Sequence, residues 1–272
     1  MTVWSAREAA ANSHYCVPPR EVVRVSILVL GINGSPREYG NTYRLLRVAL
    51  EGARSEGARV EIRHLHRMRI EPCKGCVSDD ERSCRYPCII DDDMKRLYDE
   101  LLEADGLIVA TPVYWYNVSG HVKNFIDRLT ALENMIHFEG RSWLEGKVAG
   151  FIAVGNDVGA LAVIQGLMAV MNSMGMLVPP WALAYYERRG DVLEDEQAIL
   201  DAWNVGRAVA IAAKLLKEAD VRWYVVAGAP LQRAVRRARR EARELELRQR
   251  ATRLKLFKAL AKAGLKQTGL GD

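Results

Sequence analysis

Residues 22–42 read VVRVSILVLGINGSPREYGNT and hold a strand, a turn and the start of a helix in direct succession. The run Val22–Leu30 is mostly apolar, as expected of a strand that is covered on both faces. The stretch Gly34–Thr42 is rich in turn residues, and apolar residues at helical spacing follow from Tyr43 onward. This order predicts a buried strand that leads through a short loop into a helix.

The same alternation of strand and helix recurs along the chain. The other expected strands are Arg59–Leu65, Gly106–Thr111, Lys147–Val154 and Leu177–Tyr185, with helical patterns between them and a closing helix at Glu194–Lys217. Because parallel strands need crossover connections, this pattern predicts an α/β fold: a doubly wound, five-stranded parallel sheet with helices on both faces. Ligands of such folds bind at the carboxyl ends of the strands.

The pattern divides the chain into an N-terminal extension (1–21), the α/β domain (22–218) and a basic helical extension (219–272). With 272 residues, of which 49% are hydrophobic, the chain is long enough for one large domain with appendages. No run approaches the roughly 20 apolar residues of a membrane helix, and the N-terminus lacks the order of a secretory signal. We therefore expect a cytoplasmic protein.

The loop Gly34–Thr42 has donors suited to a phosphate. It lacks the Gly-Lys-Ser/Thr ending of a nucleoside-triphosphate loop and the GxGxxG of a dinucleotide fold. Ser35, Arg37, Asn41 and Thr42 instead surround a helix start, which Asn41 or Thr42 is placed to cap. Such donors can envelop a phosphate monoester, as on FMN, without a metal. The alternative is a plain helix cap after a turn.

Two later loops also follow expected strands. Residues 111–120, TPVYWYNVSG, would offer a flat flavin ring apolar walls and backbone amides. Residues 155–159, GNDVG, could present amides and Asn156 to the polar edge of the ring. Alternatively, the three aromatic residues of the first loop are core or subunit contacts, and the second loop is only a turn.

Four of the five cysteines lie within sixteen residues, at spacings of x2, x7 and x3: Cys73, Cys76, Cys84 and Cys88. This arrangement does not resemble the spread framework of a secreted disulfide protein. Four thiolates in one loop suit tetrahedral zinc or an iron–sulfur cluster, with free or redox-paired thiols as the alternative. Cys16 stands apart, and the five histidines have no regular ligand spacing, so we assign them no function. Asp91–Asp93 is expected to cap the next helix.

In order, these motifs resemble the NAD(P)H-dependent FMN reductase family, particularly its iron–sulfur flavoprotein branch, which has a flavodoxin-like fold. The resemblance rests on GSPREYGNT, the cysteine segment ending in CIIDDDM, the run Glu103–Arg128 and the turn GNDVGA. It implies that the FMN phosphate is held by Ser35, Arg37, Asn41 and Thr42. It also implies that the isoalloxazine is flanked by Pro112, Val113, Tyr114, Trp115 and Asn117, with Gly155, Asn156 and Asp157 near its pyrimidine side. Asp127 and Arg128, in the family's Phe-Ile-Asp-Arg helix, are expected to make a structural salt bridge.

The same branch holds a [4Fe–4S] cluster with a compact Cys-x2-Cys-x2-Cys spacing and a fourth cysteine further on. Here Asp79 stands at the third position, so Cys84 has to substitute. We expect the four clustered cysteines to ligate one such centre close to the flavin, with zinc as the next option.

The resemblance implies an oxidoreductase in which NAD(P)H passes hydride to flavin N5 and the electrons leave to a quinone, a flavin or another acceptor. Because the hard chemistry belongs to the cofactor, no catalytic side chain is expected. The alternative is a non-enzymatic FMN and iron–sulfur electron carrier or redox sensor that docks protein partners. No ribose-phosphate motif selects NADH or NADPH.

The formal net charge of +5 is concentrated in the tail, since residues 231–266 hold thirteen Lys and Arg against three Glu. Five residues of this segment recur at helical spacing: Leu231, Val235, Ala238, Ala242 and Leu245. Pro230 suits a first turn. We expect a long helix that packs on another subunit, in line with the dimers and tetramers of the family. A solvated helix, or one that binds nucleic acid or an anionic membrane, are the alternatives.

Overall fold

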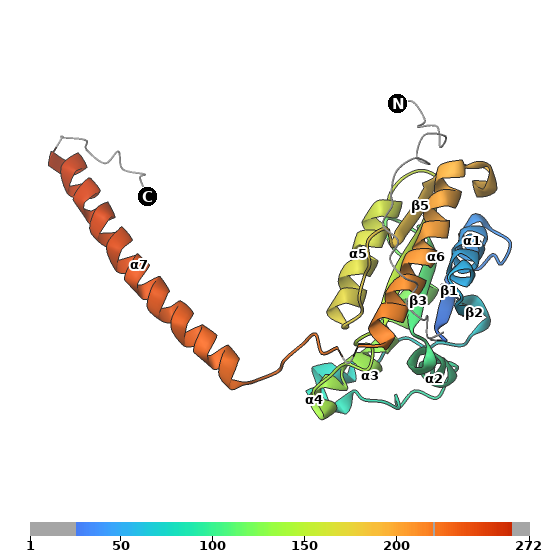
Figure 1. Ribbon diagram of the computed structural model, residues 1–272, viewed down its shortest axis with the longest axis horizontal. Coiled ribbons are helices and arrows are strands. Elements are labelled where there is room, and N and C mark those ends of the chain that lie inside the picture. Colours follow the sequence, from blue (N-terminus) through green and yellow to red (C-terminus); the bar gives the residue numbers. More distant parts are fainter. Residues whose placement is uncertain (1–25, 220, 263–272) are drawn as a thin grey trace, which may run out of the picture. The chain divides into compact units, whose positions relative to one another are not determined.

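The computed structural model describes residues 26–219 and 221–262, which divide into two compact units, one up to Arg222 and one from Trp223 on (Figure 1). The expected N-terminal extension at residues 1–21, Cys16 and the start of the first expected strand lie outside the described residues, as do residues 263–272.

The first unit is built on a parallel sheet of five strands in the order β2-β1-β3-β4-β5. The strands are β1 (Leu28–Asn33), β2 (Arg59–His64), β3 (Gly106–Pro112), β4 (Val148–Gly155) and β5 (Leu183–Glu187). This order, 2-1-3-4-5, is that of the flavodoxin-like doubly wound fold. The expected fold class is therefore confirmed.

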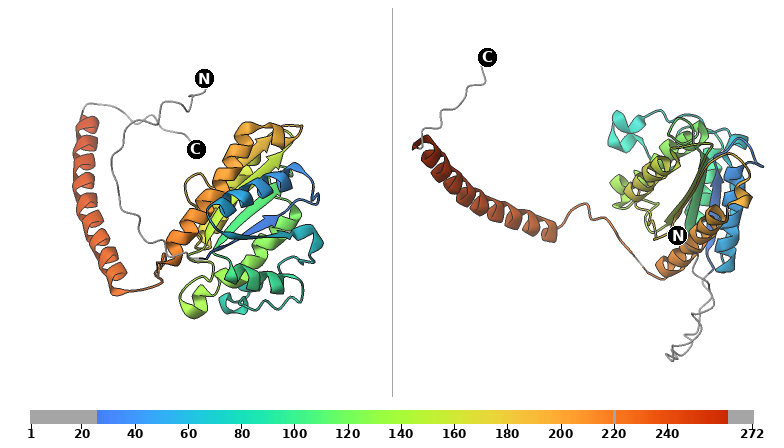
Figure 2. Two further views of the ribbon diagram at one scale, coloured as in Figure 1. Left: turned by 45° about the vertical axis from the view of Figure 1, so that its right-hand side comes forward. Right: turned by 90° about the horizontal axis from the view of Figure 1, so that it is seen from above.

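Helices cover both faces of the sheet (Figure 2). One face packs against α1 (Asn41–Ser55) and α6 (Glu196–Lys217), and the other packs against α2 (Met94–Glu103), α3 (Gly120–Glu133) and α5 (Ala160–Ser173). The short helix α4 (Ile136–Glu139) and four single 3-10 turns, η1 (Leu65–Arg67), η2 (Cys76–Ser78), η3 (Glu81–Ser83) and η4 (Val192–Glu194), lie in the connections.

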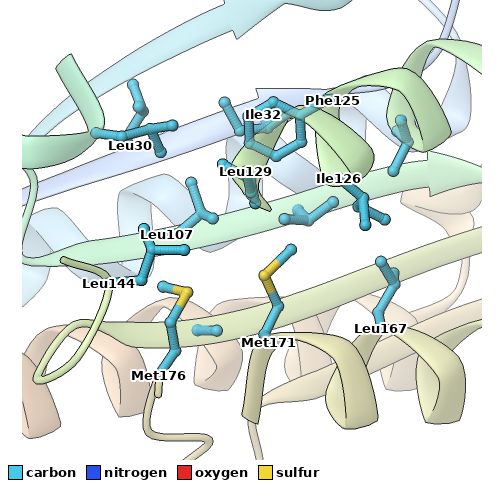
Figure 3. Close-up of a cluster of buried hydrophobic side chains, with 14 of the residues drawn as sticks. Leu30, Ile32, Leu107, Phe125, Ile126, Leu129, Leu144, Leu167, Met171 and Met176 are labelled. Atoms are coloured by element: carbon cyan, nitrogen blue, oxygen red, sulfur yellow. The ribbon is translucent and has the colours of Figure 1, made fainter. Parts of the chain in front are cut away.

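Side chains along β1 alternate between the two cores, as the period of a strand requires. Leu28, Leu30 and Ile32 belong to the cluster under α2, α3 and α5, whereas Val29 belongs to the cluster under α1 and α6. Figure 3 shows part of the first cluster, where aliphatic, aromatic and methionine side chains from strands and helices meet. Most side chains of both clusters are almost fully buried, so the sheet is expected to be a firm support for the loops at its edge.

Two strands differ from the predicted boundaries by more than one residue. The first strand ends at Asn33 rather than Leu30, because the ladder to β2 continues through Gly31 and Ile32. The last strand begins at Leu183 rather than Leu177. Leu177 makes only an isolated bridge to Val148, and Pro179 and Pro180, which have no N–H for a ladder, separate it from β5.

Helices α1 and α6 approach so closely that their contact requires glycine. A Cβ on Gly206 would lie 1.6 Å from the carbonyl oxygen of Ala49, and one on Gly52 would lie 2.2 Å from that of Trp203. At its N-terminus, α6 is capped by Asp195, whose side chain accepts a hydrogen bond from the Ala198 N–H. The predicted closing helix is thus observed within two residues of its expected start.

The described part of the second unit contains α7 (Ala229–Lys262), so the long helix expected in the tail is present, with Pro230 in its first turn. None of its residues is buried, and the apolar positions Leu231, Val235 and Leu245 are all exposed. Among the described residues, every helix is too short or too polar to span a bilayer.

Candidate functional site

A cavity of about 340 Å³ opens at the carboxyl edge of the sheet, where the loops after β1, β3, β4 and β5 meet. Nine of the residues expected to bind FMN line it: Ser35, Arg37, Asn41, Thr42, Pro112, Val113, Tyr114, Gly155 and Asn156. Five residues without an assigned role line it as well: Tyr39, Gly40, Arg44, Val154 and Gly190. The sequence motifs, although up to about 120 residues apart, therefore share one cavity.

The stretch Gly34–Thr42, hereafter the phosphate loop, is anchored on neighbouring elements. The Gly34 N–H donates to the Ala110 carbonyl (2.8 Å), and the Ser119 hydroxyl donates to the Gly34 carbonyl (2.8 Å). A Cβ at Gly34 would come within 2.1 Å of the Val122 side chain. Only glycine lets the loop lie this close to α3.

The phosphate loop leads into α1, whose N-terminus has no side-chain cap. The N-cap is Gly40, in an extended conformation, so the expected capping by Asn41 or Thr42 is wrong. The Asn41 side chain instead donates to the Gly190 carbonyl (2.8 Å) and accepts from the Val192 N–H (3.4 Å), which ties α1 to the loop after β5. The N–H groups in the first turn of α1 are therefore available to bind an anion, and the helix dipole favours negative charge at this end.

The far end of the cavity has apolar walls from two adjacent strands. The Val113 N–H donates to the Val154 carbonyl (2.8 Å), which holds the loops after β3 and β4 together. A Cβ on Gly155 would lie 3.4 Å from the Val113 Cβ, so the two loops are in close contact. Pro112 and Tyr114 extend this wall, and a flat ring would fit against it.

The loop after β3 then makes a strained turn. Trp115 and Tyr116 have φ angles of 52° and 61°, and Tyr114 and Asn117 exchange backbone hydrogen bonds across them (2.9 and 3.0 Å). Left-handed backbone at bulky residues costs on the order of 1 kcal/mol each and is typical of functional sites. Trp115 is 95% exposed as a result.

A second cavity, of about 460 Å³, adjoins the first because both are lined by Val113 and Tyr114. Its other lining residues are Trp115, Tyr116, Asp157 and Val158. Of the residues expected to bind FMN, Trp115 and Asp157 therefore lie in this neighbouring cavity. Asn117 lines neither of these two cavities, and its side chain accepts a hydrogen bond from the Val118 N–H (2.9 Å).

The four cysteines lie between η1 and α2 as free thiols; Cys73 is exposed, and the others are half-buried. Burial first, and then the nearby Cys73, Cys88 and Cys76, raise the pKa of the Cys84 thiol to about 11. Cys84 is therefore close enough to the other three cysteines to feel their charge. In the described part of the chain, however, no three of them converge within 4.8 Å. Tetrahedral zinc draws its sulfurs to about 3.8 Å from one another, whereas a four-iron cluster holds its ligands further apart.

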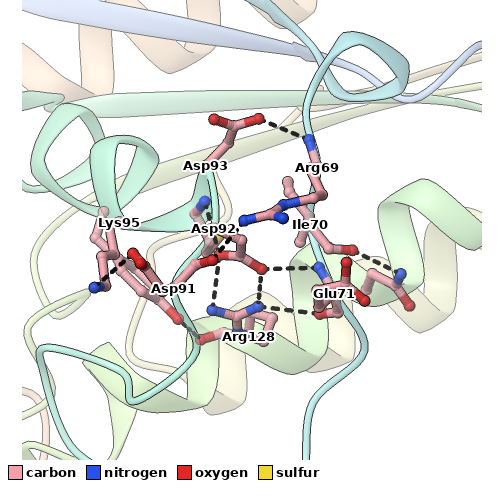
Figure 4. Close-up of polar contacts among 11 residues, drawn as sticks. Arg69, Ile70, Glu71, Asp91, Asp92, Asp93, Lys95 and Arg128 are labelled. Atoms are coloured by element: carbon pink, nitrogen blue, oxygen red, sulfur yellow. Dashed lines mark hydrogen bonds and ion pairs between the residues drawn. The ribbon is translucent and has the colours of Figure 1, made fainter.

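A buried ion pair closes the base of the cysteine segment (Figure 4). Arg128 Nη1 and Nη2 donate to the two carboxylate oxygens of Asp92 (2.6 and 3.1 Å), and Nη1 also donates to the Glu71 carbonyl (3.0 Å). Asp92 in turn accepts from the backbone N–H groups of Glu71 (2.8 Å) and Met94 (3.1 Å). The entry and exit of the segment are thereby joined to each other and to α3.

This pairing changes two expectations. Arg128 pairs with Asp92, while Asp127 pairs with Lys123 on the exposed side of α3, so Asp127 and Arg128 do not pair with each other. As expected of a cap, Asp92 accepts a hydrogen bond from the Met94 N–H at the start of α2. The same carboxylate also accepts two hydrogen bonds from Arg128, which the sequence did not indicate. Burial alone would raise the pKa of Asp92, and the hydrogen bonds from Arg128 and from the Glu71 N–H outweigh it and hold that pKa below its usual value.

The histidines at the end of β2 contact the phosphate loop, although no function was expected for them. His64 Nδ1 lies 2.9 Å from Asn33 Nδ2, and His66 Nε2 lies 3.0 Å from Glu38 Oε1. Glu38 is also paired with Arg67. Among the described residues, one set of three side chains that could ligate a metal ion has its ligand atoms within 4.8 Å of one another: Glu38, His64 and His66. Asn33 engages His64 and Arg67 engages Glu38, so these residues form a polar network at the end of β2.

Arg44 and Gly190 were missed for different reasons. Arg44 lies one turn into α1, on the face that begins at Asn41, so helical spacing from the phosphate loop could have identified it. Gly190 follows β5, and only the hydrogen bond from the Asn41 side chain to its carbonyl, a contact across 149 residues, brings it to the cavity.

Comparison with known proteins finds relatives of this chain among iron-sulfur flavoproteins. An iron-sulfur flavoprotein of Methanocaldococcus jannaschii, MJ1083, is 34% identical over 70% of this chain and 99% of its own length. One from Archaeoglobus fulgidus is 33% identical over 61% of this chain and 72% of its own length. Among solved structures, RosB with a bound riboflavin-phosphate intermediate has a TM-score of 0.59 at 19% identity, covering 79% of this chain and 87% of its own, and shows the fold alone.

The model of the family described as NADPH-dependent FMN reductase matches residues 27–187, a span that contains all five strands of the sheet. Because this match covers more than half of the chain and includes the cavity-lining loops after β1, β3 and β4, the chain belongs to the NADPH-dependent FMN reductase family.

Proposed function

We propose that this protein is an FMN-dependent oxidoreductase that takes electrons from NAD(P)H and passes them to a small acceptor such as a quinone or a free flavin. Family membership supports FMN-dependent oxidoreduction. The observation that carries the finer proposal is the single cavity that joins an uncapped helix N-terminus to an apolar wall.

The phosphate end of the cavity fits a monoester. Buried Ser35 and Thr42, the guanidinium of Arg37 and the free N–H groups of α1 supply donors of the right kind. The Arg37 N–H donates to the Ser35 hydroxyl oxygen (3.1 Å), which leaves the hydroxyl proton to point at a ligand. These residues would bind and orient FMN without a metal.

The ring end positions the flavin between the loops after β3 and β4. FMN, when bound, supplies the hydride and electron chemistry, so the protein needs no acid–base pair. Val113 and Tyr114 line both this cavity and the adjoining one, which we assign to the nicotinamide and the acceptor in turn, so either molecule would contact the flavin at the shared boundary. The exposed Trp115 and Tyr116 offer these flat molecules a stacking surface.

We also propose that the cysteine segment holds a [4Fe–4S] cluster. Two relatives are named iron-sulfur flavoproteins, and the sulfurs of Cys73, Cys76, Cys84 and Cys88 are close but wider apart than zinc requires. Iron and sulfide analysis of anaerobically prepared protein tests this, with Cys84→Ser as the variant that should lose both. Near-stoichiometric zinc without iron would contradict the proposal.

We also propose that α7 packs on another subunit in a homodimer or homotetramer. Its stripe of Leu231, Val235 and Leu245 is exposed, and an isolated helix gains little stability without a packing partner. Truncation after Ala229 should lower the mass measured by light scattering. If the truncated protein keeps its mass but loses a salt-sensitive retention on DNA that the full chain shows, the helix binds polyanions instead.

Steady-state turnover tests the proposed activity directly. The protein loaded with FMN should oxidise NADH or NADPH with a quinone as the acceptor, without any added protein. A protein that holds FMN but turns over only with a separate reductase would be an electron carrier instead.

A further inference from the structure

Asn33 links the end of β2 to the phosphate loop through two side-chain hydrogen bonds. It is the last residue of β1 and is fully buried. Its Oδ1 accepts from the Ser35 N–H (3.1 Å), and its Nδ2 lies 2.9 Å from His64 Nδ1. The backbone conformation at Ser35 therefore depends on how the Asn33 amide is oriented.

The chemistry of these groups sets every donor and acceptor in this chain of hydrogen bonds. A backbone N–H can only donate, so the atom facing Ser35 must be Oδ1 of Asn33. The amide nitrogen is then turned toward His64, and because an amide nitrogen only donates, His64 Nδ1 must accept. An imidazole accepts only when it is neutral, so the remaining proton of His64 is on Nε2.

The surroundings of His64 favour this neutral form. The ring is half-buried beside Tyr43 of α1, with ring centroids 5.5 Å apart. Burial lowers the pKa of His64 most strongly, and the charges of Arg67 and His66 lower it further. Glu38 of the phosphate loop acts in the opposite direction, but its carboxylate is shared with Arg67 and His66.

We infer that neutral His64 is a positioning residue that holds the phosphate loop, through Asn33, in the shape that grips the phosphate of FMN. The inference rests on the proposed function, since it takes Ser35 and its neighbours to contact that phosphate. It adds a control by acidity that acts through residues outside the cavity lining.

Protonation of His64 breaks this arrangement. A proton on Nδ1 places two donors against each other, Nδ1–H and the Asn33 amide. If the amide turns over, its nitrogen faces the Ser35 N–H, and the conflict moves into the phosphate loop. In either orientation one buried donor loses its acceptor. We expect FMN affinity to fall about tenfold as a result.

The test compares FMN binding by the full chain and by His64→Asn, between about pH 8 and about pH 5. Asparagine can place a side-chain oxygen near the position of Nδ1, so it keeps the acceptor but cannot take up a proton. The phosphate of FMN itself titrates near pH 6, but that effect is common to both proteins. The Kd of the unmodified protein should rise about tenfold more on acidification than that of the variant.

A second variant separates the acceptor from the proton. His64→Leu removes the acceptor at every pH, so it should bind FMN about tenfold more weakly than His64→Asn even at about pH 8. Parallel pH profiles of the unmodified protein and His64→Asn would overturn the inference, as would equal affinities of the two variants.

Nitrogen NMR of the flavin-free protein reads the tautomer of His64 without depending on the proposed function. At about pH 8 we expect a neutral ring that is protonated on Nε2. A proton on Nδ1 would contradict the hydrogen-bond chain. If no FMN binds at any pH, the proposed function fails, while the tautomer still tests this arrangement.

Discussion

Replacing Arg128 with methionine should destabilise the first unit strongly, because it leaves the carboxylate of Asp92 buried without its counter-charge. The side chains of Arg128 and Asp92 are 1% and 0% exposed. Breaking such a pair from one side costs about 3 to 5 kcal/mol. Asp92 keeps the N–H donors of Glu71 and Met94, so we expect the lower end, about 3 kcal/mol.

Urea unfolding at neutral pH measures this cost. With a slope of about 2 kcal/mol per molar urea, the midpoint should fall by about 1.5 M. Lys123→Met is the matched control on α3, because the Lys123–Asp127 pair has side chains that are 58% and 38% exposed. An exposed pair at this spacing contributes only about 0.5 kcal/mol. If Arg128→Met unfolds at the same urea concentration as this control, the reasoning is refuted.

The pH dependence of the same variant has a definite sign. In the unmodified protein the pKa of Asp92 is held below its usual value, so its contribution is present above about pH 4 and is lost as pH falls through the folded pKa. Without Arg128, burial raises the pKa of Asp92. Protonation of Asp92 in acid then removes the unpaired buried charge that destabilises the variant. The stability gap should therefore be widest near neutrality and narrow in acid. Adding Asp92→Asn to Arg128→Met should recover about 1 kcal/mol or more at neutral pH.

Three further substitutions probe the loops of the cavity. Gly34→Ala should lower the free energy of unfolding, measured by thermal unfolding, by about 1 to 3 kcal/mol, because its Cβ would lie 2.1 Å from the Val122 side chain. Gly120→Ala is the control and should be neutral, since a Cβ there would have no atom within 4 Å. Equal costs of the two substitutions would contradict the close approach at Gly34. Trp115→Asn should raise stability by about 1 kcal/mol, because asparagine tolerates a φ of 52°; a lower melting temperature would show that the turn is not strained. Asn41→Ala should cost about 1 kcal/mol through its lost bonds to the loop after β5; no change in the melting temperature would contradict this.

The fold was predictable because its determinants are local and periodic. Nearly continuous apolar runs such as Gly106–Thr111 and Lys147–Val154 are typical of strands buried on both faces, and the alternation with helices leaves few arrangements of the sheet. The boundary of β5 was wrong because the run Leu177–Tyr185 looks continuous, although its two prolines cannot join a ladder.

Parts of the site could not be predicted, since they depend on contacts between segments far apart in the chain. Asparagine is a residue type that often caps helices, yet the Asn41 side chain donates instead to a carbonyl 149 residues away. His64 acquires a partner only when β1 and β2 pair in register, which sets Asn33 beside it. Spacing alone gives no sign of either contact. The glycines and hydroxyls of the phosphate loop were recognisable because their chemistry is local.

The most direct test of the central claim is a binding titration with FMN and FAD, using the purified protein and the double variant Arg37→Ala, Thr42→Ala. We expect one FMN per chain, weaker binding of FAD, and loss of FMN from a variant that remains folded by circular dichroism. FMN bound by the folded variant with unchanged affinity, or a preference of the unmodified protein for FAD, would show that the phosphate loop does not hold the terminal phosphate of FMN.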